Sequence, residues 1–280
     1  MEEVCVITGG GSGMGLAAAE YMPKEKILVI SGRTQSKLEK AAEKLQALGH
    51  TVYIKTCDTS KRKSVKELAE FASSLGEIKN VINSAGLSPN MAEPEKILRV
   101  NALGTVYVNE EFSRRMKKGS VIVDIASNSA YVLPGFLINK KTYRLADADE
   151  KVFLKKILGI CRFAKRDYVK SGLAYAFSKN FTVWYASKCA FEYGKKRIRV
   201  ASLSPGLIAT DMGNLEKEEG GALIPYTAEE RIGTAEELGF AIAALADERN
   251  GYLAGVDILC DGGATYGKQF KRDKHRKNFL

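Results

Sequence analysis

Residues 4–15 read VCVITGGGSGMG, and this stretch decides the fold of the chain. Its first residues are apolar and mostly β-branched, which favours a buried strand. Glycines then dominate up to residue 15, and the following segment, Leu16–Glu20, has helical character. Glycines at a strand-to-helix turn let the backbone approach a pyrophosphate, and the helix N-terminus offers it free N–H groups. The stretch therefore predicts the first unit of a dinucleotide-binding domain rather than a flexible turn.

The same alternation of strand and helix continues along the chain. Amphipathic segments such as Ser36–Leu48 and Lys63–Leu75 separate short β-branched runs. Strands separated by helices imply right-handed crossovers, so we predict an α/β fold with a doubly wound parallel sheet of Rossmann type, in a single domain spanning residues 1–280. The expected sheet has about seven strands, at Val4–Ile7, Ile27–Ser31, Thr51–Lys55, Asn80–Asn83, Ser120–Ile125, Ile198–Leu203 and Val256–Cys260.

Composition excludes several classes of protein. The chain has 280 residues, of which 45% are hydrophobic, enough for a sizeable core. No basic leader and no apolar run of membrane-spanning length is present, so we expect a soluble, cytoplasmic protein. Five scattered cysteines without a C-x-x-C pair and only two histidines argue against disulfides, a zinc site or a histidine-based triad. We therefore expect no metal.

A basic segment at residues 266–280 carries much of the net charge of +10. Such a run is usually a solvated tail, and the alternative is a contact with an anionic partner or another subunit. No nucleic-acid-binding motif and no basic stripe with interleaved aromatic residues occurs elsewhere. We therefore expect no nucleic-acid partner and no membrane partner.

The glycine spacing, T-G-x-x-x-G-x-G, differs from the G-x-G-x-x-G of two-domain dehydrogenases and resembles the short-chain dehydrogenase/reductase family. Further motifs follow in the family's order over nearly the whole chain, and several independent matches are more specific than one. They are Asp58 after the third strand, Asn83-Ser84-Ala85-Gly86, Asn101, Ser127, a Tyr-x-x-x-Lys, Pro205-Gly206 through Thr210, and Asp261-Gly262-Gly263.

Two tyrosine-lysine pairs compete for the family's catalytic motif: Tyr175 with Lys179, and Tyr185 with Lys188. Ligands of a doubly wound sheet lie beyond the carboxyl ends of the strands, so a helix leading back to the next strand passes them with its N-terminal turns. On one helix Tyr185 would lie about 15 Å farther from that edge than Tyr175. We therefore assign the motif to Tyr175, in the opening turn, and Lys179, and expect Tyr185 and Lys188 on the helix surface or at a subunit interface.

The resemblance implies a role for each catalytic residue. Tyr175 would be the general acid/base, because a free tyrosine with a pKa near 10 needs a neighbouring positive charge to exchange its proton near neutrality. Lys179 would supply that charge and hold the nicotinamide ribose. Ser127 would hydrogen-bond the substrate oxygen, with Ser129 as a substitute, unless Ser127 is a plain strand-end hydroxyl. Asn101 would anchor a water for proton relay.

Cofactor preference follows from the end of the second strand. Enzymes for NAD usually carry an acidic residue there, whereas this chain has Arg33, whose guanidinium suits a 2′-phosphate. NADP(H) is therefore favoured and NAD stays an alternative, because Arg33 could be an ordinary loop arginine and Ser12 stands where many NADP-using relatives are basic. Asp58, for its part, could accept from the adenine amino group or simply begin a helix. The implied cofactor contacts are Gly9, Ser12, Gly13, Met14, Gly15, Arg33, Thr34, Asp58, Thr59, Asn83, Ser84, Ala85, Gly86, Tyr175, Lys179, Pro205, Gly206, Ile208 and Thr210.

An insertion at residues 130–172 departs from most relatives. Its apolar positions recur at helical spacing, namely Phe153, Ile157, Ile160, Cys161 and Ala164, so we predict a helical excursion before the catalytic helix and beside the active site. Together with the string Leu173–Asn180, it resembles the bacterial 3α-hydroxysteroid dehydrogenase/carbonyl reductase branch. An apolar helical stripe buries against protein as readily as against ligand, so reshaping of a subunit interface stays open.

That resemblance implies an NADP(H)-dependent oxidoreductase that interconverts a secondary alcohol and a ketone, with a steroid, bile acid or bulky ketone as substrate. The alternatives are a reductase of small carbonyls or quinones and a catalytically silent NADP-binding protein. Members of the family are generally homodimers or homotetramers, and we expect one of these states.

Overall fold

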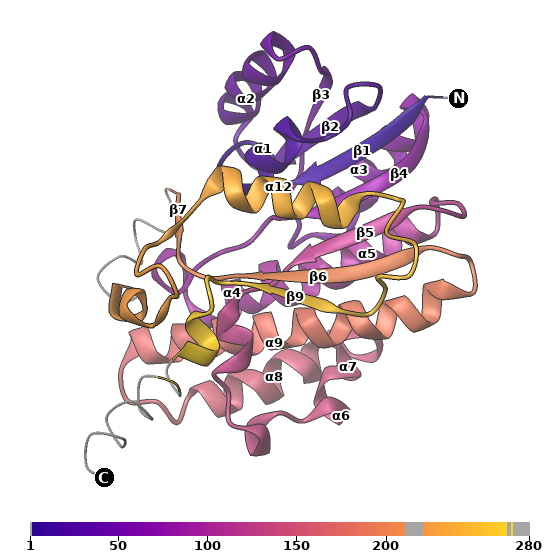
Figure 1. The fold of residues 1–280 in the computed structure, drawn as a ribbon. Helices are drawn as coiled ribbons and strands as arrows, with labels where there is room; N and C mark the ends of the chain where they lie inside the picture. Colours follow the sequence, from indigo (N-terminus) through magenta and orange to yellow (C-terminus); the bar gives the residue numbers. More distant parts are fainter. Residues whose placement is uncertain (1, 211–220, 268–269, 271–280) are drawn as a thin grey trace.

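A parallel seven-stranded sheet forms the centre of the computed structural model, which describes residues 2–210, 221–267 and 270. The strand order is β3-β2-β1-β4-β5-β6-β9, and every neighbouring pair is parallel. Figure 1 shows these strands side by side between layers of helices. The doubly wound sheet predicted from the sequence is confirmed. The strands are β1 (Glu3–Thr8), β2 (Ile27–Gly32), β3 (Thr51–Thr56), β4 (Glu77–Asn83), β5 (Val121–Ile125), β6 (Arg199–Pro205) and β9 (Asp257–Cys260).

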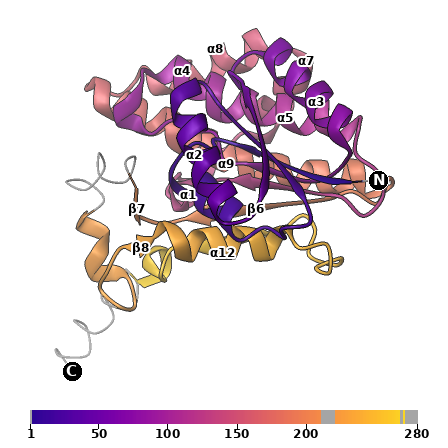
Figure 2. The ribbon, with the colours of Figure 1, turned by 90° about the horizontal axis from the view of Figure 1, so that it is seen from above.

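Helices cover both faces of this sheet, as expected for strands that are apolar on both sides. One face packs against α1 (Gly13–Glu20), α2 (Gln35–Ala47) and α12 (Ala235–Ala246). The other face packs against α3 (Arg62–Leu75), α4 (Pro94–Leu98), α5 (Gly104–Ser113) and α9 (Asp167–Gly194). Figure 2 shows α3 and α5 on one side of the sheet and α12 on the opposite side.

Alternating side chains of each strand enter these two cores. In β1, Val4 and Val6 join the core beneath α9, whereas Cys5 and Ile7 join the core beneath α12. This alternation follows from the two-residue repeat of a strand, and it explains why the strand reads as a continuous apolar run. A small second sheet, β7 (Ile208–Ala209) with β8 (Gly233–Thr234), was not predicted, because two-residue strands leave no periodic signal.

The long helix α9 begins eight residues before Tyr175, at Asp167. The expectation that Tyr175 stands in its opening turn was therefore wrong. Tyr185 also differs from expectation, since its side chain is only 1% exposed and its ring stacks on Phe181 with centroids 5.3 Å apart. Lys188 stays near the surface, where it pairs with Glu192 of the same helix at 2.8 Å.

The insertion packs against Phe181, the residue on which the Tyr185 ring stacks. It folds into α6 (Lys140–Tyr143), α7 (Leu145–Ala148) and α8 (Glu150–Cys161), close to the predicted helical excursion. Phe153 of α8 and Tyr143 of α6 contact Phe181 of α9 with ring centroids 5.2 and 5.4 Å apart. Phe181 and Trp184 of α9 therefore face the insertion, which the local sequence around Tyr185 does not reveal.

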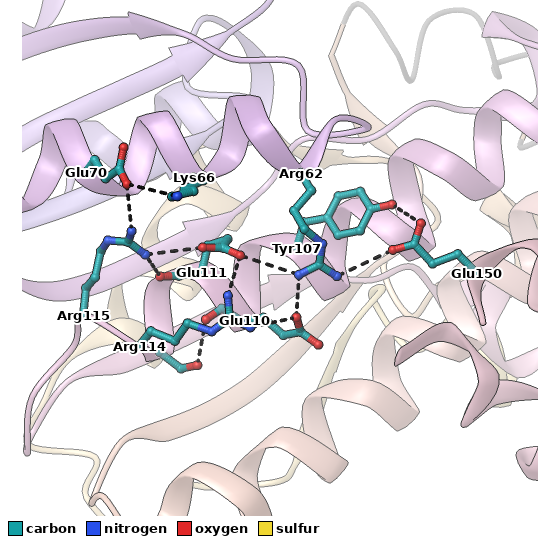
Figure 3. Close-up of polar contacts among 10 residues, drawn as sticks. Arg62, Lys66, Glu70, Tyr107, Glu110, Glu111, Arg114, Arg115 and Glu150 are labelled. Atoms are coloured by element: carbon teal, nitrogen blue, oxygen red, sulfur yellow. Dashed lines mark hydrogen bonds and ion pairs between the residues drawn. The ribbon is translucent and has the colours of Figure 1, made fainter. Parts of the chain in front are cut away.

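Ion pairs also hold the insertion against the outer helices. Arg62 of α3 pairs with Glu110 of α5 at 2.5 Å and with Glu150 of α8 at 3.6 Å. Its guanidinium lies over the Tyr107 ring, 4.5 Å from the centroid, and the Tyr107 hydroxyl donates to Glu150 at 2.7 Å. Figure 3 shows Arg62 between the Tyr107 ring and these carboxylates. Because several charges share this network, it fixes the start of α8 better than an isolated surface pair would.

Two further expectations concern the basic C-terminal segment and membrane-spanning helices. Most of the basic segment at 266–280 lies outside the described residues, so its role stays a prediction. Within residues 2–210, 221–267 and 270, no helix is both long enough and apolar enough to cross a membrane.

Candidate active site

Two adjoining cavities lie at the carboxyl ends of the strands, where a doubly wound sheet binds its ligands. The central cavity has a volume of about 600 Å³ and is lined by Ser127, Tyr175 and Lys179 among others. The glycine-turn cavity has a volume of about 250 Å³ and is lined by Gly9, Ser12 and Gly13 among others. The two share a wall made by Met14, Ser84, Gly86, Leu87 and Thr210. The two cavities therefore adjoin along the carboxyl ends of the strands.

The turn between β1 and α1 needs its glycines for steric reasons. Gly9 and Gly13 have φ angles of +69° and +56°, which residues with a Cβ rarely adopt. A Cβ on Gly15 would lie 2.6 Å from the carbonyl oxygen of Gly9, so α1 can start this close to the strand only with glycine there. The N-terminus of α1 therefore faces the glycine-turn cavity with free backbone N–H groups.

Residues that were predicted to hold the adenosine end of the cofactor line the glycine-turn cavity. Arg33, Thr34, Asp58 and Thr59 line it, as expected from their positions after β2 and β3. Lys37, in the first turns of α2, lines the same cavity and was missed in the sequence. Helical spacing gave no signal for Lys37, because Arg33 lies before α2 and its N-cap Thr34.

Asp58 has a structural use besides any contact with adenine. Its Oδ1 accepts hydrogen bonds from the backbone N–H and the hydroxyl of Ser60, at 3.1 and 2.7 Å. Burial raises the pKa of Asp58, but the bonds from Ser60 outweigh this effect and leave the pKa below its ordinary value. Asp58 is therefore ionised at neutral pH and shapes the turn before α3, but it does not cap that helix, whose N-cap is Lys61.

Asn83 and Gly15 line neither cavity, although both belong to the predicted cofactor set. The Asn83 side chain accepts from the Thr8 hydroxyl at 2.9 Å and donates to Asp124 at 2.8 Å. Asn83 thus ties β1 to β5 underneath the site, whereas Ser84, Ala85 and Gly86 line the glycine-turn cavity.

Asp124, at the end of β5, is a fully buried carboxylate that the sequence analysis did not single out. It accepts from Asn83 and, through both oxygens, from Asn109 at 3.0 and 2.9 Å. Burial raises its pKa from the ordinary 3.8 to about 6, although the hydrogen bonds and the nearby Lys179 act in the opposite direction. A carboxyl group whose pKa is close to neutral pH therefore lies behind α9, the helix that carries Tyr175 and Lys179.

The variant Asp124→Asn tests this carboxylate. The pKa of Asp124 is higher in the folded protein than in the unfolded chain, so its protonated form stabilises the fold. This contribution to the free energy of unfolding is complete below about pH 4 and is lost as the pH rises through about 6. Asparagine removes this dependence, and its amide could donate to Asn109 Oδ1, which has no partner among the described residues. The free energy of unfolding of the variant, relative to the parent, should therefore rise by about 2 kcal/mol between pH 4.5 and pH 7.5. Urea titrations across this range measure the difference, and a difference that is constant with pH would contradict the assignment.

Tyr175 and Lys179 lie one turn apart on α9, and both line the central cavity. Lys179 is 7% exposed, and its Nζ donates to the carbonyl oxygen of Ile125 at 2.8 Å. The same Nζ lies 5.7 Å from the centroid of the Tyr175 ring. The lysine and the phenol therefore line the same cavity close to each other, as the predicted pairing of the two residues requires.

Ser127 and Ser129 stand together opposite this pair, and both line the central cavity. Their hydroxyl oxygens are 2.6 Å apart, and the backbone N–H of Ser129 donates to Ser127 Oγ at 3.2 Å. The structure therefore brings the predicted serine and its substitute into one hydrogen-bonded pair.

Asn101 lies behind the central cavity, in a π-helical turn between α4 and α5 (Arg99–Leu103). The Asn101 side chain bonds both backbone groups of Leu87. Its Nδ2 donates to the carbonyl oxygen at 2.9 Å, and its Oδ1 accepts from the N–H at 2.8 Å. Its Nδ2 also donates to Ser178 Oγ at 3.2 Å, which joins the turn to α9. The amide thus links the Leu87 backbone to the Ser178 side chain of α9, and the water relay stays a prediction.

Residues after β6 complete the central cavity. Pro205, Gly206, Ile208 and Thr210 all line it, as predicted. A Cβ on Gly206 would lie 2.8 Å from the Cα of Asp261, so the two loops approach each other closely at this point.

The two ends of the insertion also reach the central cavity. Tyr131 and Val132 line it at the start of the insertion, and Tyr168 and Gly172 line it at the end. The helices between them pack on α9 and α5 instead. The insertion therefore forms part of the site with its ends only, while its middle braces the catalytic helix.

Metal ligands are not part of this arrangement. In the portion of the chain that the structure describes, no group of three or more His, Cys, Asp or Glu residues could hold a metal ion.

Comparison with protein-family models gives two matches. Residues 3–137 match the model described as short chain dehydrogenase. Residues 147–265 match the model described as Enoyl-(Acyl carrier protein) reductase. The two matches cover both the glycine turn and the catalytic helix.

Individual relatives agree with these matches. The chain is 27% identical to short-chain dehydrogenase/reductase bsc3 of Alternaria brassicicola, over 94% of this chain and 96% of that protein. It is 25% identical to the 7alpha-hydroxysteroid dehydrogenase of Bacteroides fragilis, over 94% of each. Its fold resembles that of a short chain dehydrogenase from Burkholderia cenocepacia, solved in complex with NADP, with a TM-score of 0.73 at 19% identity, over 94% of this chain and 97% of that chain.

Proposed function

Because this chain belongs to the short-chain dehydrogenase/reductase family, and so is an oxidoreductase, we propose that it interconverts a bulky secondary alcohol and its ketone with NADP(H). The observation that carries the proposal is the central cavity, where Ser127, Tyr175 and Lys179 line one space of about 600 Å³. This space continues into the glycine-turn cavity, so a dinucleotide and a large substrate have room side by side.

The residues of the site provide the proton chemistry of the reaction. When bound, NADPH supplies the hydride that reduces the carbonyl carbon. Ser127 donates a hydrogen bond to the carbonyl oxygen, and Tyr175 transfers its proton to that oxygen as the alcohol forms. Lys179 stabilises the resulting phenolate, which then regains a proton from solvent. In the oxidative direction Tyr175 accepts the alcohol proton.

NADP(H) is proposed over NAD(H) on the basis of charge. Two cations, Arg33 and Lys37, line the cavity beyond β2, and the segment Ser31–Thr34 contains no acidic residue. A carboxylate at this point would repel a 2′-phosphate, whereas a guanidinium and an ammonium attract it. Of the remaining predicted contacts, Ile208 and Thr210 would hold the nicotinamide end.

A steroid or another bulky ring compound is the proposed substrate class. The central cavity is lined by aliphatic side chains such as Leu87, Val132 and Leu207, and by the rings of Tyr131 and Tyr168. Such walls suit the flat apolar face of a fused-ring ketone. The similarity to a hydroxysteroid dehydrogenase supports the same class.

A homodimer or homotetramer in the cytoplasm completes the proposal. Strand β9 forms an edge of the sheet and carries the partly exposed Ile258, so this edge offers unpaired backbone groups and an apolar side chain to a second subunit. The five cysteines are all unpaired, which suits a reducing compartment.

Turnover of a ketone panel tests the proposed function. NADPH oxidation is followed by its absorbance with fused-ring ketosteroids, smaller cyclic ketones, quinones and diacetyl. We expect kcat/KM for the best ketosteroid to exceed that for diacetyl by about 100-fold, because the larger ring system buries more apolar surface in the central cavity. A preference for the small carbonyls would favour the small-substrate alternative, and no turnover of any member would favour a silent NADP-binding protein.

A further inference from the structure

A third cavity, the distal cavity, adjoins the central cavity on the side of β9 and α12. Its volume is about 300 Å³. The distal and central cavities share five lining residues, so the two cavities lie directly against each other. The shared residues are Asn128, Leu207, Ile208, Leu223 and Ala264. A molecule that fills the central cavity therefore has a second compartment directly against it.

The walls of the distal cavity are largely aliphatic. Leu223, Ile224 and Ile232 lie around it half-exposed, and the buried Leu238 of α12 forms part of its floor. Partly exposed aliphatic side chains around a cavity favour the binding of an apolar group, because that group displaces water from their surfaces. The lining thus favours a hydrocarbon occupant.

The charges at the rim argue against an anionic occupant. Among the described lining residues the cation is Arg231, and the carboxylates are Glu229, Glu237 and Asp261. Arg231 is already paired with Glu237 at 2.7 Å and with Glu229 at 2.6 Å. The rim therefore carries an excess of negative charge, and a carboxylate entering it would meet repulsion rather than a free cation.

We propose that the distal cavity binds the uncharged alkyl end of the substrate, remote from the carbon that reacts at Tyr175. This inference rests on the proposed function and narrows it: the preferred substrates are neutral ring ketones or alcohols with an aliphatic side chain, rather than compounds whose side chain ends in a carboxylate. The central cavity holds the ring system of the substrate. Leu207 and Leu223 contact the substrate where its alkyl chain passes from the central into the distal cavity.

Cys260 supplies a probe of this compartment that needs no turnover. Its thiol lines the distal cavity at the end of β9 and is half-buried. The other four cysteines, all within the described residues, are buried. An alkylating reagent should therefore modify Cys260 first, at mildly alkaline pH because burial raises its pKa.

The experiment uses three ketosteroids with the same reacting ring: one without a side chain, one with the cholestane alkyl side chain, and one with the cholanic acid side chain. Iodoacetamide modification of Cys260 in the full chain with NADP⁺ is followed by peptide mass spectrometry. We expect saturating alkyl ketosteroid to slow the modification by about tenfold, the carboxylate compound to slow it less, and the compound without a side chain to leave it nearly unchanged. Equal rates with all three would overturn the proposal, and stronger protection by the carboxylate compound would overturn its charge argument.

A cavity-filling variant gives the kinetic counterpart. Cys260→Phe should lower the ratio of kcat/KM for the alkyl compound over the compound without a side chain by about tenfold, whereas the matched Cys260→Ala should preserve the ratio. An unchanged ratio in a folded Cys260→Phe protein contradicts the proposal. If no ketone is reduced, the proposed function fails, but protection of Cys260 still shows whether the alkyl end occupies the distal cavity.

Discussion

Replacement of Tyr175 by phenylalanine is expected to lower kcat for ketone reduction by about 10³-fold, within the range that a positioned general acid contributes. The ring and its place on α9 are kept, so the affinity for NADPH should change little. The physical reason is that Tyr175 carries the hydroxyl that lies one helical turn from Lys179 in the central cavity. Steady-state kinetics and NADPH fluorescence titration measure the two quantities separately.

Tyr185→Phe is the matched control, because it removes a hydroxyl from the same helix about 15 Å away. The Tyr185 ring stacks on Phe181 beneath the insertion and lines none of the three cavities. Its removal should change kcat by less than about twofold, as expected for a side chain outside the reacting groups. A Tyr185 variant that loses turnover beside an active Tyr175 variant would reverse the assignment of the motif.

Removal of both cations beyond β2, in the double variant Arg33→Ser/Lys37→Ser, is expected to have the second largest effect. Each charge-assisted hydrogen bond to a phosphate contributes about 1.5–3 kcal/mol, so kcat/KM for NADPH should fall by about 100-fold. NADH lacks the 2′-phosphate, and its kcat/KM should stay nearly constant. The ratio of the two values therefore reports the role of this part of the glycine-turn cavity.

Lys40→Ser serves as the control for charge alone. Lys40 belongs to the same helix as Lys37 but is exposed and lines none of the cavities. It should leave the ratio unchanged apart from weak long-range electrostatics, which salt suppresses. If the parent protein already prefers NADH, the proposal for NADP(H) is wrong whatever the variants do.

The fold could be read from the sequence because its signals are local. Each strand is a short β-branched run, and each crossover helix has its own apolar stripe, so seven strands were predicted within a few residues of their observed bounds. The glycine turn was equally accessible, because the positive φ angles of Gly9 and Gly13 and the close approach at Gly15 depend on neighbouring residues. Such short-range requirements leave a mark on residue types at fixed spacing.

Errors arose where a residue's surroundings come from distant parts of the chain. Tyr185 was expected on the helix surface or at a subunit interface, but it is buried and stacks on Phe181, which α6 and α8 of the insertion contact. The tie that the Asn83 amide makes between β1 and β5 was missed, because its partners Thr8 and Asp124 lie on neighbouring strands. Lys37 was missed because only the folded turn brings α2 beside the glycine-turn cavity. In each case the deciding contact joins segments far apart in the sequence.

The sequence by itself determined the sheet, the glycine turn and the spacing that sets Tyr175 and Lys179 on one face of a helix, because these depend on backbone sterics and on periodicity within single elements. Only the tertiary structure decided which side chains share a cavity, that the ends of the insertion reach the site while its middle braces α9, and that a second apolar compartment adjoins the first. The reason is that burial and cavity shape are sums over contacts between separate elements, and no single segment contains both partners of such a contact.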